Sequence, residues 1–229
     1  MARDELLMQR ANEPSYVPTL RLYEWEPTIS LGYFQRFEDV QHQDQSVAEL
    51  PVVRRLTGGG AILHDFELTY SIILPVDHPL VAGKPNQLYE LAHDAIIRFL
   101  EKEGMAAHRN GETDDSGAAK GPFFCFARRH ALDVLIGDDK IAGSAQRRTR
   151  TALLQHGSLI LGRRFTAQPS AEINQPHEAL VAIARRVFPD LLAEQLGLDA
   201  YEENWHASEL LAVQPFEEKY AGDDWTRRT

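Results

Sequence analysis

Residues 54–65 read Arg-Arg-Leu-Thr-Gly-Gly-Gly-Ala-Ile-Leu-His-Asp, and this stretch indicates more about the fold than any other. Its notable members are two arginines, three consecutive glycines and the polar end of an apolar run: Arg54, Arg55, Gly58, Gly59, Gly60, His64 and Asp65. A glycine backbone passes close to a ligand because no Cβ is present, and its N–H groups can surround an anionic oxygen. The arginines add positive charge and forked donors. The stretch favours a pocket for an acyl or anionic group, although three glycines also suit a tight connection between strands.

Several common site motifs are absent from the sequence. No Gly-Lys-Ser/Thr follows the glycines, and the Gly-x-Gly-x-x-Gly spacing is missing, so neither a phosphate-binding loop nor a dinucleotide fingerprint is present. No His-Glu-x-x-His or Cys-x-x-Cys occurs either. We therefore expect no metal site.

Length and composition limit the class of protein. The 229 residues contain no repeat and no recognisable linker, so we expect a single domain over residues 1–229. The net charge of −10 argues against nonspecific nucleic-acid binding. The apolar runs are shorter than the roughly 20 residues of a membrane span, and the first ten residues lack a secretory signal. A single cysteine suits a reducing compartment. We expect a cytoplasmic protein that uses neither nucleic acid nor membrane as partner.

The hydrophobic pattern predicts an α+β fold. Short runs rich in β-branched and aromatic residues predict strands at residues 20–25, 29–34, 52–55, 61–74 and 153–161, and a hairpin over residues 131–145. Apolar residues at helical spacing predict helices over residues 86–105, from 176 onward, and over 202–220. The polar segment 107–121 is predicted to be a mobile loop. Strands followed and flanked by helices favour a mixed or antiparallel sheet covered by helices.

Cys125 is the only cysteine and lies in the segment Gly-Pro-Phe-Phe-Cys-Phe-Ala-Arg-Arg. A cysteine among phenylalanines is often a buried small hydrophobic residue. Arg128 and Arg129, however, follow closely, and positive charge favours the thiolate. A thiolate is a suitable nucleophile for taking an acyl group from a thioester. Both interpretations stand on the residues alone.

Lys140 precedes three small residues, Gly143, Ser144 and Ala145. The simple interpretation is a solvated lysine in a hairpin. The functional one is that the small residues leave room for a ligand, and that the lysine holds an oxygen or relays a proton.

His64 and His156 are further candidates, and His156 precedes Gly157 in an apolar strand. Each histidine suits a satisfied core position as well as a catalytic one. Arg147, Arg148, Arg150, Arg163 and Arg164 concentrate positive charge in an acidic chain, either as a solvated surface or as a docking site for an acidic carrier protein.

Taken together, these segments resemble the lipoate/octanoate attachment family, which shares its fold with biotin-protein ligases. The matching pieces follow the family's order over nearly the whole chain, at residues 21–25, 30–35, 54–70, 140–146, 154–158 and 218–225. The resemblance implies the biotin/lipoate ligase fold, the attachment of a medium-chain acyl group to a lysine of a lipoyl domain, and a substrate pocket formed by the glycine stretch and the small residues after Lys140.

Two mechanisms occur in the family that the chain resembles. Ligases activate a free acid with ATP, whereas octanoyltransferases take the acyl chain from acyl carrier protein onto a cysteine. Gram-positive-type transferases carry that nucleophile in a Cys-Phe pair shortly before a Lys-x-x-Gly-Ser-Ala strand, and Cys125 with Phe126 is similar. The resemblance thus implies Cys125 as acyl acceptor and Lys140 as its catalytic partner.

Our leading hypothesis is an octanoyltransferase of protein lipoylation that needs no cofactor. It would use octanoyl-acyl carrier protein and a lipoyl-domain protein, or a protein like the glycine cleavage H protein. The alternatives are an ATP- and magnesium-dependent lipoate-protein ligase and a non-catalytic acyl- or carrier-binding relative in which Cys125 is merely buried.

Overall fold

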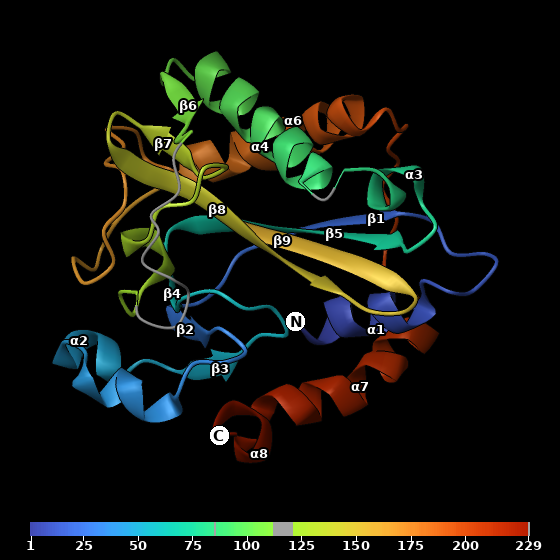
Figure 1. The fold of residues 1–229 in the computed structure, drawn as a ribbon, viewed down its shortest axis with the longest axis horizontal. Helices are drawn as coiled ribbons and strands as arrows, with labels where there is room; N and C mark the ends of the chain where they lie inside the picture. Colours follow the sequence, from blue (N-terminus) through green and yellow to red (C-terminus); the bar gives the residue numbers. More distant parts are fainter. Residues whose placement is uncertain (85, 112–120, 229) are drawn as a thin grey trace.

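Two β-sheets form the centre of the protein, and helices cover them on two sides (Figure 1). The computed structural model describes residues 1–84, 86–111 and 121–228. The main sheet is antiparallel and contains, from edge to edge, β1 (Thr19–Tyr23), β5 (Glu67–Pro75), β9 (Ala152–Ile160), β8 (Asp139–Arg148), β7 (Val134–Ile136) and β6 (Ala107–Arg109). In the smaller sheet, β2 (Thr28–Leu31) runs parallel to β3 (Val52–Arg54) and antiparallel to β4 (Ile62–His64).

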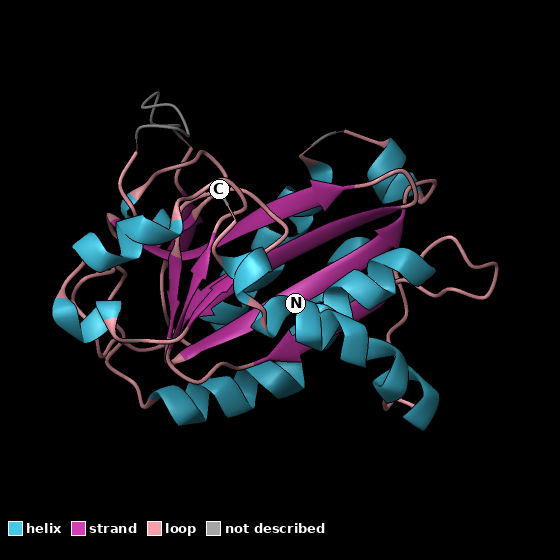
Figure 2. Ribbon diagram, turned by 90° about the horizontal axis from the view of Figure 1, so that it is seen from below, coloured by secondary structure: helices cyan, strands magenta, loops and turns pink. Residues whose placement is uncertain are grey.

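Helices pack against the sheets in two layers (Figure 1). The helical elements are α1 (Ala2–Arg10), η1 (Phe37–His42), α2 (Gln45–Ala48), α3 (Pro79–Ala82), α4 (Gln87–Lys102), η2 (Cys125–Ala127), α6 (His177–Leu196), α7 (Ala207–Ala221) and α8 (Asp223–Thr226). Helices α4 and α6 lie on one side of the main sheet, and α1 with α7 lies on the other (Figure 1). Helix α1, at the N-terminus, packs over the long strands β5 and β9, in front of them in the view from below (Figure 2).

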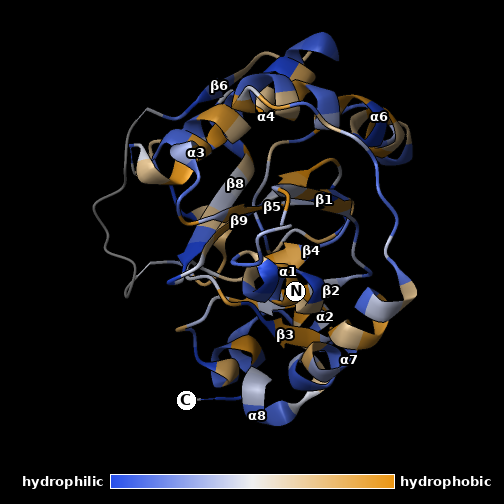
Figure 3. Ribbon diagram, turned by 90° about the vertical axis from the view of Figure 1, so that its right-hand side faces the viewer, coloured by the Kyte–Doolittle hydropathy of each residue, from blue (hydrophilic) through white to orange (hydrophobic). Residues whose placement is uncertain are grey.

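The alternation of side chains along β5 explains these two layers. Leu68, Tyr70, Ile72 and Leu74 point to one face and join the core formed with α4 and α6. Ile73 points to the other face and packs against Leu7 and Met8 of α1. β5 is buried on both faces, and the face toward α1 also carries the polar Glu67, Thr69 and Ser71. Figure 3 shows hydrophobic residues along the strands and on α4 and α6.

Most predicted elements are confirmed with shifted boundaries. The helices at 86–105 and from 176, the hairpin over 131–145 and the strand at 153–161 all appear. The α+β prediction is confirmed as well. The last helix begins only at Ala207.

Two predictions need correction, one about a strand and one about a loop. The single strand expected over residues 61–74 is two strands, separated where Phe66 adopts a positive φ of 46° and turns the chain. The strands predicted near 20–25 and 29–34 belong to different sheets, β1 to the main sheet and β2 to the smaller one. The predicted loop 107–121 begins with β6, and residues 112–120 of that prediction lie outside the described residues.

Candidate active site

The glycine stretch and the cysteine segment lie side by side at the junction of the two sheets. The backbone N–H of Ala61 donates to the carbonyl of Phe123 at 2.8 Å, and the N–H of Cys125 donates to the carbonyl of Ala61 at 2.7 Å. A Cβ at Gly60 would lie 2.8 Å from the backbone nitrogen of Cys125. The absence of a side chain at Gly60 therefore allows the two segments to pack closely.

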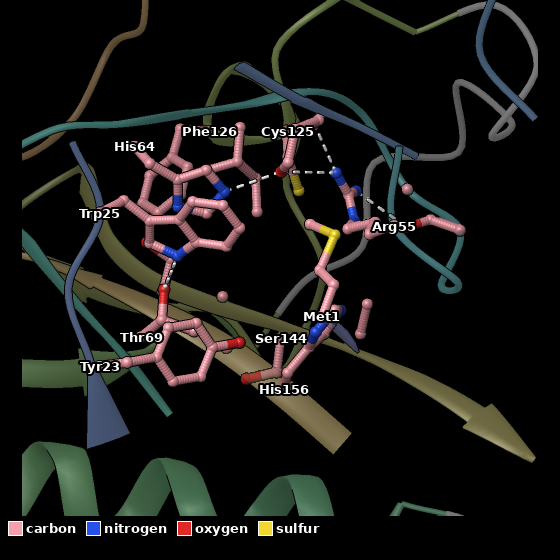
Figure 4. A pocket seen from close by; sticks show the side chains of 18 residues that line it. Met1, Tyr23, Trp25, Arg55, His64, Thr69, Cys125, Phe126, Ser144 and His156 are labelled. Atoms are coloured by element: carbon pink, nitrogen blue, oxygen red, sulfur yellow. Dashed lines mark hydrogen bonds between the residues drawn. The ribbon is translucent and has the colours of Figure 1, made fainter. Parts of the chain in front are cut away.

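A pocket opens beside Cys125 and encloses about 530 Å³, part of it open to solvent (Figure 4). The predicted site residues that line it are Arg55, Gly58, Gly59, His64, Cys125, Gly143, Ser144, Ala145, His156 and Gly157. Trp25, Ile62 and Phe126 add apolar surface. Much of the pocket wall is therefore apolar, as an acyl chain requires.

Lys140 and Cys125 are brought together although they come from different elements. Nζ of Lys140 lies 3.8 Å from Sγ of Cys125 and 2.8 Å from Oδ2 of Asp133. The Lys140 side chain is only 3% exposed, so the alternative interpretation as a solvated hairpin lysine does not hold. Asp133 also accepts a hydrogen bond from the backbone N–H of His130 at 2.8 Å. The carboxylate thus holds a buried ammonium beside the thiol.

Two predicted pocket glycines make room for protein atoms. A Cβ at Gly143 would lie 2.6 Å from Cε of Lys140, and a Cβ at Gly157 would lie 2.4 Å from Oγ of Ser144. We expected the small residues after Lys140 to leave space for a ligand. At Gly143 that space holds the lysine itself.

The two arginines of the glycine stretch differ in position relative to the pocket. Arg55 lines the pocket, and its guanidinium donates to the carbonyls of Ser30, Gly58 and Gly60 at 2.8, 2.9 and 2.6 Å. These bonds hold the glycine stretch in its curve. Burial lowers the pKa of Arg55 to about 10, and the neighbouring Cys125 opposes that shift.

Arg54 does not line the pocket, contrary to the predicted substrate-binding role. Its fully buried guanidinium donates to backbone carbonyls of Gly32, Gln35 and Thr226, among others, at 2.6–3.1 Å. Burial lowers the pKa of Arg54 as well. Its side chain ties α8 to the segment after β2.

His64 belongs to a hydrogen-bonded wall of the pocket. Its Nδ1 lies 2.9 Å from Oε1 of Glu67, and its Nε2 lies 2.7 Å from Oγ of Ser30. The ring stacks on Trp25 with centroids 4.6 Å apart, and Trp25 Nε1 donates to Thr69 Oγ1 at 3.1 Å (Figure 4). Partners on both ring nitrogens fix the ring in place.

His156 is the second predicted histidine, and it faces the glycine stretch. Its Nε2 lies 2.6 Å from Oγ1 of Thr57. Burial lowers the pKa of His156 to about 3, with the carboxylate of Asp4 opposing the shift. The ring is therefore neutral near pH 7.

Three buried polar residues that support the site were not predicted from the sequence: Tyr70, His93 and Asp133. His93 lies on the apolar side of α4, where a single histidine among Leu, Ala and Phe was the available signal. Asp133 precedes the hairpin that carries Lys140, and its role depends on the fold of that hairpin.

The predicted arginine cluster is two separate groups. Arg147, Arg148 and Arg150 lie at the β8–β9 turn, whereas Arg163 and Arg164 follow the opposite end of β9. Arg164 pairs with Asp65 at 3.1 Å. The nine residues of β9 place the two groups roughly 30 Å apart.

In residues 1–84, 86–111 and 121–228, no group of three or more His, Cys, Asp or Glu residues is placed to hold a metal ion. Over the same residues, no helix has the length and apolar composition needed to cross a membrane.

The comparisons with known proteins agree with this architecture. Residues 1–179 match the model of the lipoyl protein ligase A/B catalytic domain, and the chain belongs to that family. Among its relatives, the octanoyltransferase LipM of Kyrpidia tusciae is 39% identical over 70% of this chain. That match spans 61% of the Kyrpidia protein. The octanoyltransferase LipM of Clostridioides difficile is 30% identical, and the match covers 100% of this chain and 93% of the relative.

Solved structures of lipoate-protein ligases share the fold. Lipoate-protein ligase A bound with ATP superposes with a TM-score of 0.77 at 22% identity, covering 99% of this chain and 92% of the other. A bi-partite lipoate protein ligase from Thermoplasma acidophilum superposes with a TM-score of 0.68 at 19% identity. The superposition covers 98% of this chain and 91% of the other. At these identities the likeness establishes the fold.

Proposed function

We propose that the protein is an octanoyltransferase that moves an octanoyl group from acyl carrier protein to a lysine of a lipoyl domain, through a thioester on Cys125. The observation that carries the proposal is the position of Lys140 Nζ, 3.8 Å from Sγ of Cys125 at the wall of a largely apolar pocket. Relatives named octanoyltransferase support it.

In the first half of the reaction, the thiolate of Cys125 attacks the carbonyl carbon of the carrier thioester. The new C–S bond forms as the bond to the carrier sulfur breaks, and the carrier leaves with the proton that Cys125 gave up. Nζ of Lys140 lies 3.8 Å from Sγ of Cys125, where its positive charge faces the sulfur during the attack.

In the second half, the neutral amine of the acceptor lysine attacks the Cys125 thioester. The C–N bond forms, the C–S bond breaks with its electron pair on Sγ, and one amine proton ends on that sulfur. Lys140 is placed to relay this proton because its Nζ is near Sγ. The balanced reaction uses no ATP, metal or other cofactor.

We propose that the protein partners of this reaction are acidic carrier domains. Arg147, Arg148 and Arg150 at the β8–β9 turn offer one basic surface on a chain of net charge −10. Such a surface guides an acidic protein toward its site. A lipoyl-domain protein, or a protein like the glycine cleavage H protein, is the acceptor.

Intact-protein mass spectrometry tests the proposal. The protein is incubated with octanoyl-acyl carrier protein without ATP, and then with a lipoyl domain. We expect an octanoyl adduct on Cys125 that disappears as the lipoyl domain gains the octanoyl group. Lys140→Met should form the adduct at least about 10²-fold more slowly, because a positioned proton-transfer group contributes about 10²–10⁴-fold.

Cys125→Ser separates the alternatives. It should form no octanoyl thioester and no product. Product that requires ATP and still forms in Cys125→Ser would identify a ligase instead. If neither donor gives product, the protein is an acyl- or carrier-binding relative.

A further inference from the structure

The hydroxyl of Ser144, at the wall of the pocket, lies between two buried side chains. Its Oγ is 2.6 Å from Nε2 of His93 on α4 and 2.6 Å from the phenol oxygen of Tyr70 on β5. His93 and Tyr70 are each 1% exposed. Neither lines the pocket, whereas Ser144 does. Ser144 thus connects a buried polar chain to the acyl site.

The hydroxyl proton of Ser144 has one available acceptor, Nε2 of His93. Nδ1 of His93 faces the carbonyl oxygen of Leu132, and a carbonyl only accepts, so Nδ1 carries the hydrogen. Burial lowers the pKa of His93 to about 4, which keeps the ring neutral near pH 7. Nε2 therefore presents a lone pair, and the Ser144 hydroxyl donates its proton to it.

The other bonds of the chain run in the same direction. Because the Ser144 proton is used, the Tyr70 hydroxyl donates to Ser144. Nε2 of Gln155 donates to the Tyr70 oxygen at 2.9 Å, and Nε2 of Gln146 donates to Oε1 of Gln155 at 2.8 Å. Burial raises the pKa of Tyr70 to about 12, so the phenol keeps its proton. One set of donor and acceptor roles accounts for all of these hydrogen bonds, and a network satisfied in this way is rigid.

This arrangement limits what Ser144 can offer a substrate. A serine hydroxyl has one proton and two lone pairs. The proton goes to His93 and one lone pair accepts from Tyr70, so one lone pair remains. Ser144 can then accept a hydrogen bond from an N–H group but cannot donate one to a carbonyl oxygen.

We propose, resting on the transferase function above, that His93 is a positioning residue for the second half of the reaction. It holds Ser144 as an acceptor, and Ser144 binds one N–H of the attacking lysine amine. That N–H is the one retained in the amide product. The other amine proton ends on Sγ of Cys125 as the C–N bond forms and the C–S bond breaks. The thioester carbonyl oxygen points away from Ser144.

Separate measurement of the two half-reactions tests the inference. Octanoyl adduct formation from octanoyl-acyl carrier protein is followed first, and transfer from the isolated adduct to a lipoyl domain is followed second. In His93→Phe the Ser144 proton loses its acceptor. We expect the transfer to slow about tenfold, the effect of one lost hydrogen bond in a transition state, and adduct formation to change little.

Three further variants keep the test specific. His93→Gln retains an acceptor near the Nε2 position and should recover most of the transfer rate. Ser144→Ala should slow the transfer about as much as His93→Phe, for the same reason. In the double variant, His93→Phe should add little further slowing, because it acts through Ser144. Thermal unfolding compares the folded stability of all variants, and Ser144→Ala carries the test if His93→Phe does not fold.

The possible results separate this inference from the function on which it rests. If the unaltered protein forms no octanoyl adduct, the transferase function is overturned and this inference with it. If the adduct forms but His93→Phe slows both halves equally, leaves both unchanged, or slows transfer further in the Ser144→Ala background, the positioning role alone is overturned.

Discussion

The amino group of Lys140 occupies the space that a side chain at Gly143 would take. A Cβ at Gly143 would lie 2.6 Å from Cε and 2.8 Å from Nζ of that lysine. Both residues are in β8, three positions apart. The glycine therefore determines where the ammonium lies relative to Sγ of Cys125.

We expect Gly143→Ala to displace Lys140 and to slow octanoyl adduct formation by about 10²-fold, since a misplacement of about 1 Å has an effect of that size. Stopped-flow or quenched mass spectrometry gives the rate. Gly222→Ala is the matched control, because a Cβ there meets only the carbonyls of Glu218 and Lys219 at 3.4 Å. Equal rates in Gly143→Ala and the unaltered protein would contradict the role of Gly143.

Asp133→Asn tests the buried ion pair at the site. Nζ of Lys140 and Oδ2 of Asp133 are 2.8 Å apart and both side chains are buried. Removal of the carboxylate leaves a buried ammonium without its charge partner, which costs about 3 kcal/mol in the free energy of unfolding. Urea denaturation measures this loss.

The double variant Asp133→Asn/Lys140→Met provides the control for that loss. It removes the unpaired charge and should recover part of the stability, while adduct formation stays slow. Additive loss of stability in the double variant would show that the two residues act independently.

Arg54→Leu distinguishes a structural role from a substrate-binding one. The substitution leaves the buried carbonyl of Thr226 without its side-chain donor, and an unsatisfied buried group costs about 1–3 kcal/mol. The carbonyl of Gly32 keeps the backbone N–H of Gln35 as a donor. We expect a lower free energy of unfolding but an unchanged KM for octanoyl-acyl carrier protein in the fraction that remains folded. If Arg54→Leu raised the KM but left the free energy of unfolding unchanged, Arg54 would bind substrate as the sequence predicted.

Acidification should destabilise the protein between pH 6.5 and about pH 4. Above pH 6.5, His93 and His156 are neutral in the folded and unfolded chains. Their folded pKa values are lowered by burial to about 4 and about 3, so below pH 6.5 the unfolded chain binds protons that the folded chain does not. As the pH falls through this window, each ring lowers the free energy of unfolding by about 1.4 kcal/mol per pH unit.

Urea denaturation at several pH values between 7 and 4 measures this dependence. His93→Gln removes one of these two rings with a lowered pKa and should reduce the slope. A free energy of unfolding that stays constant as the pH falls through this window would contradict the prediction.

Local sequence patterns determined much of the fold. The helical spacing of apolar residues over 86–105 and the hairpin residues around Gly137 act over short distances, so both were predicted with small boundary shifts. The split at Phe66 was not predicted, because a non-glycine residue with positive φ carries no recognisable signal. Pairing of β1 with β5 and of β2 with β3 was also missed, since strand partners depend on long-range contacts.

The sequence by itself determined the residue types of the site: a single cysteine, a lysine before small residues, and a glycine stretch. It left open whether Cys125 was a buried hydrophobic residue and whether Lys140 was solvated. Tertiary packing placed these two side chains 3.8 Å apart, moved Arg54 away from the pocket and joined Ser144 to His93. Residue type follows from the chain, but burial and partners depend on which distant strands and helices meet, and these decide the chemistry of a lysine, an arginine or a serine.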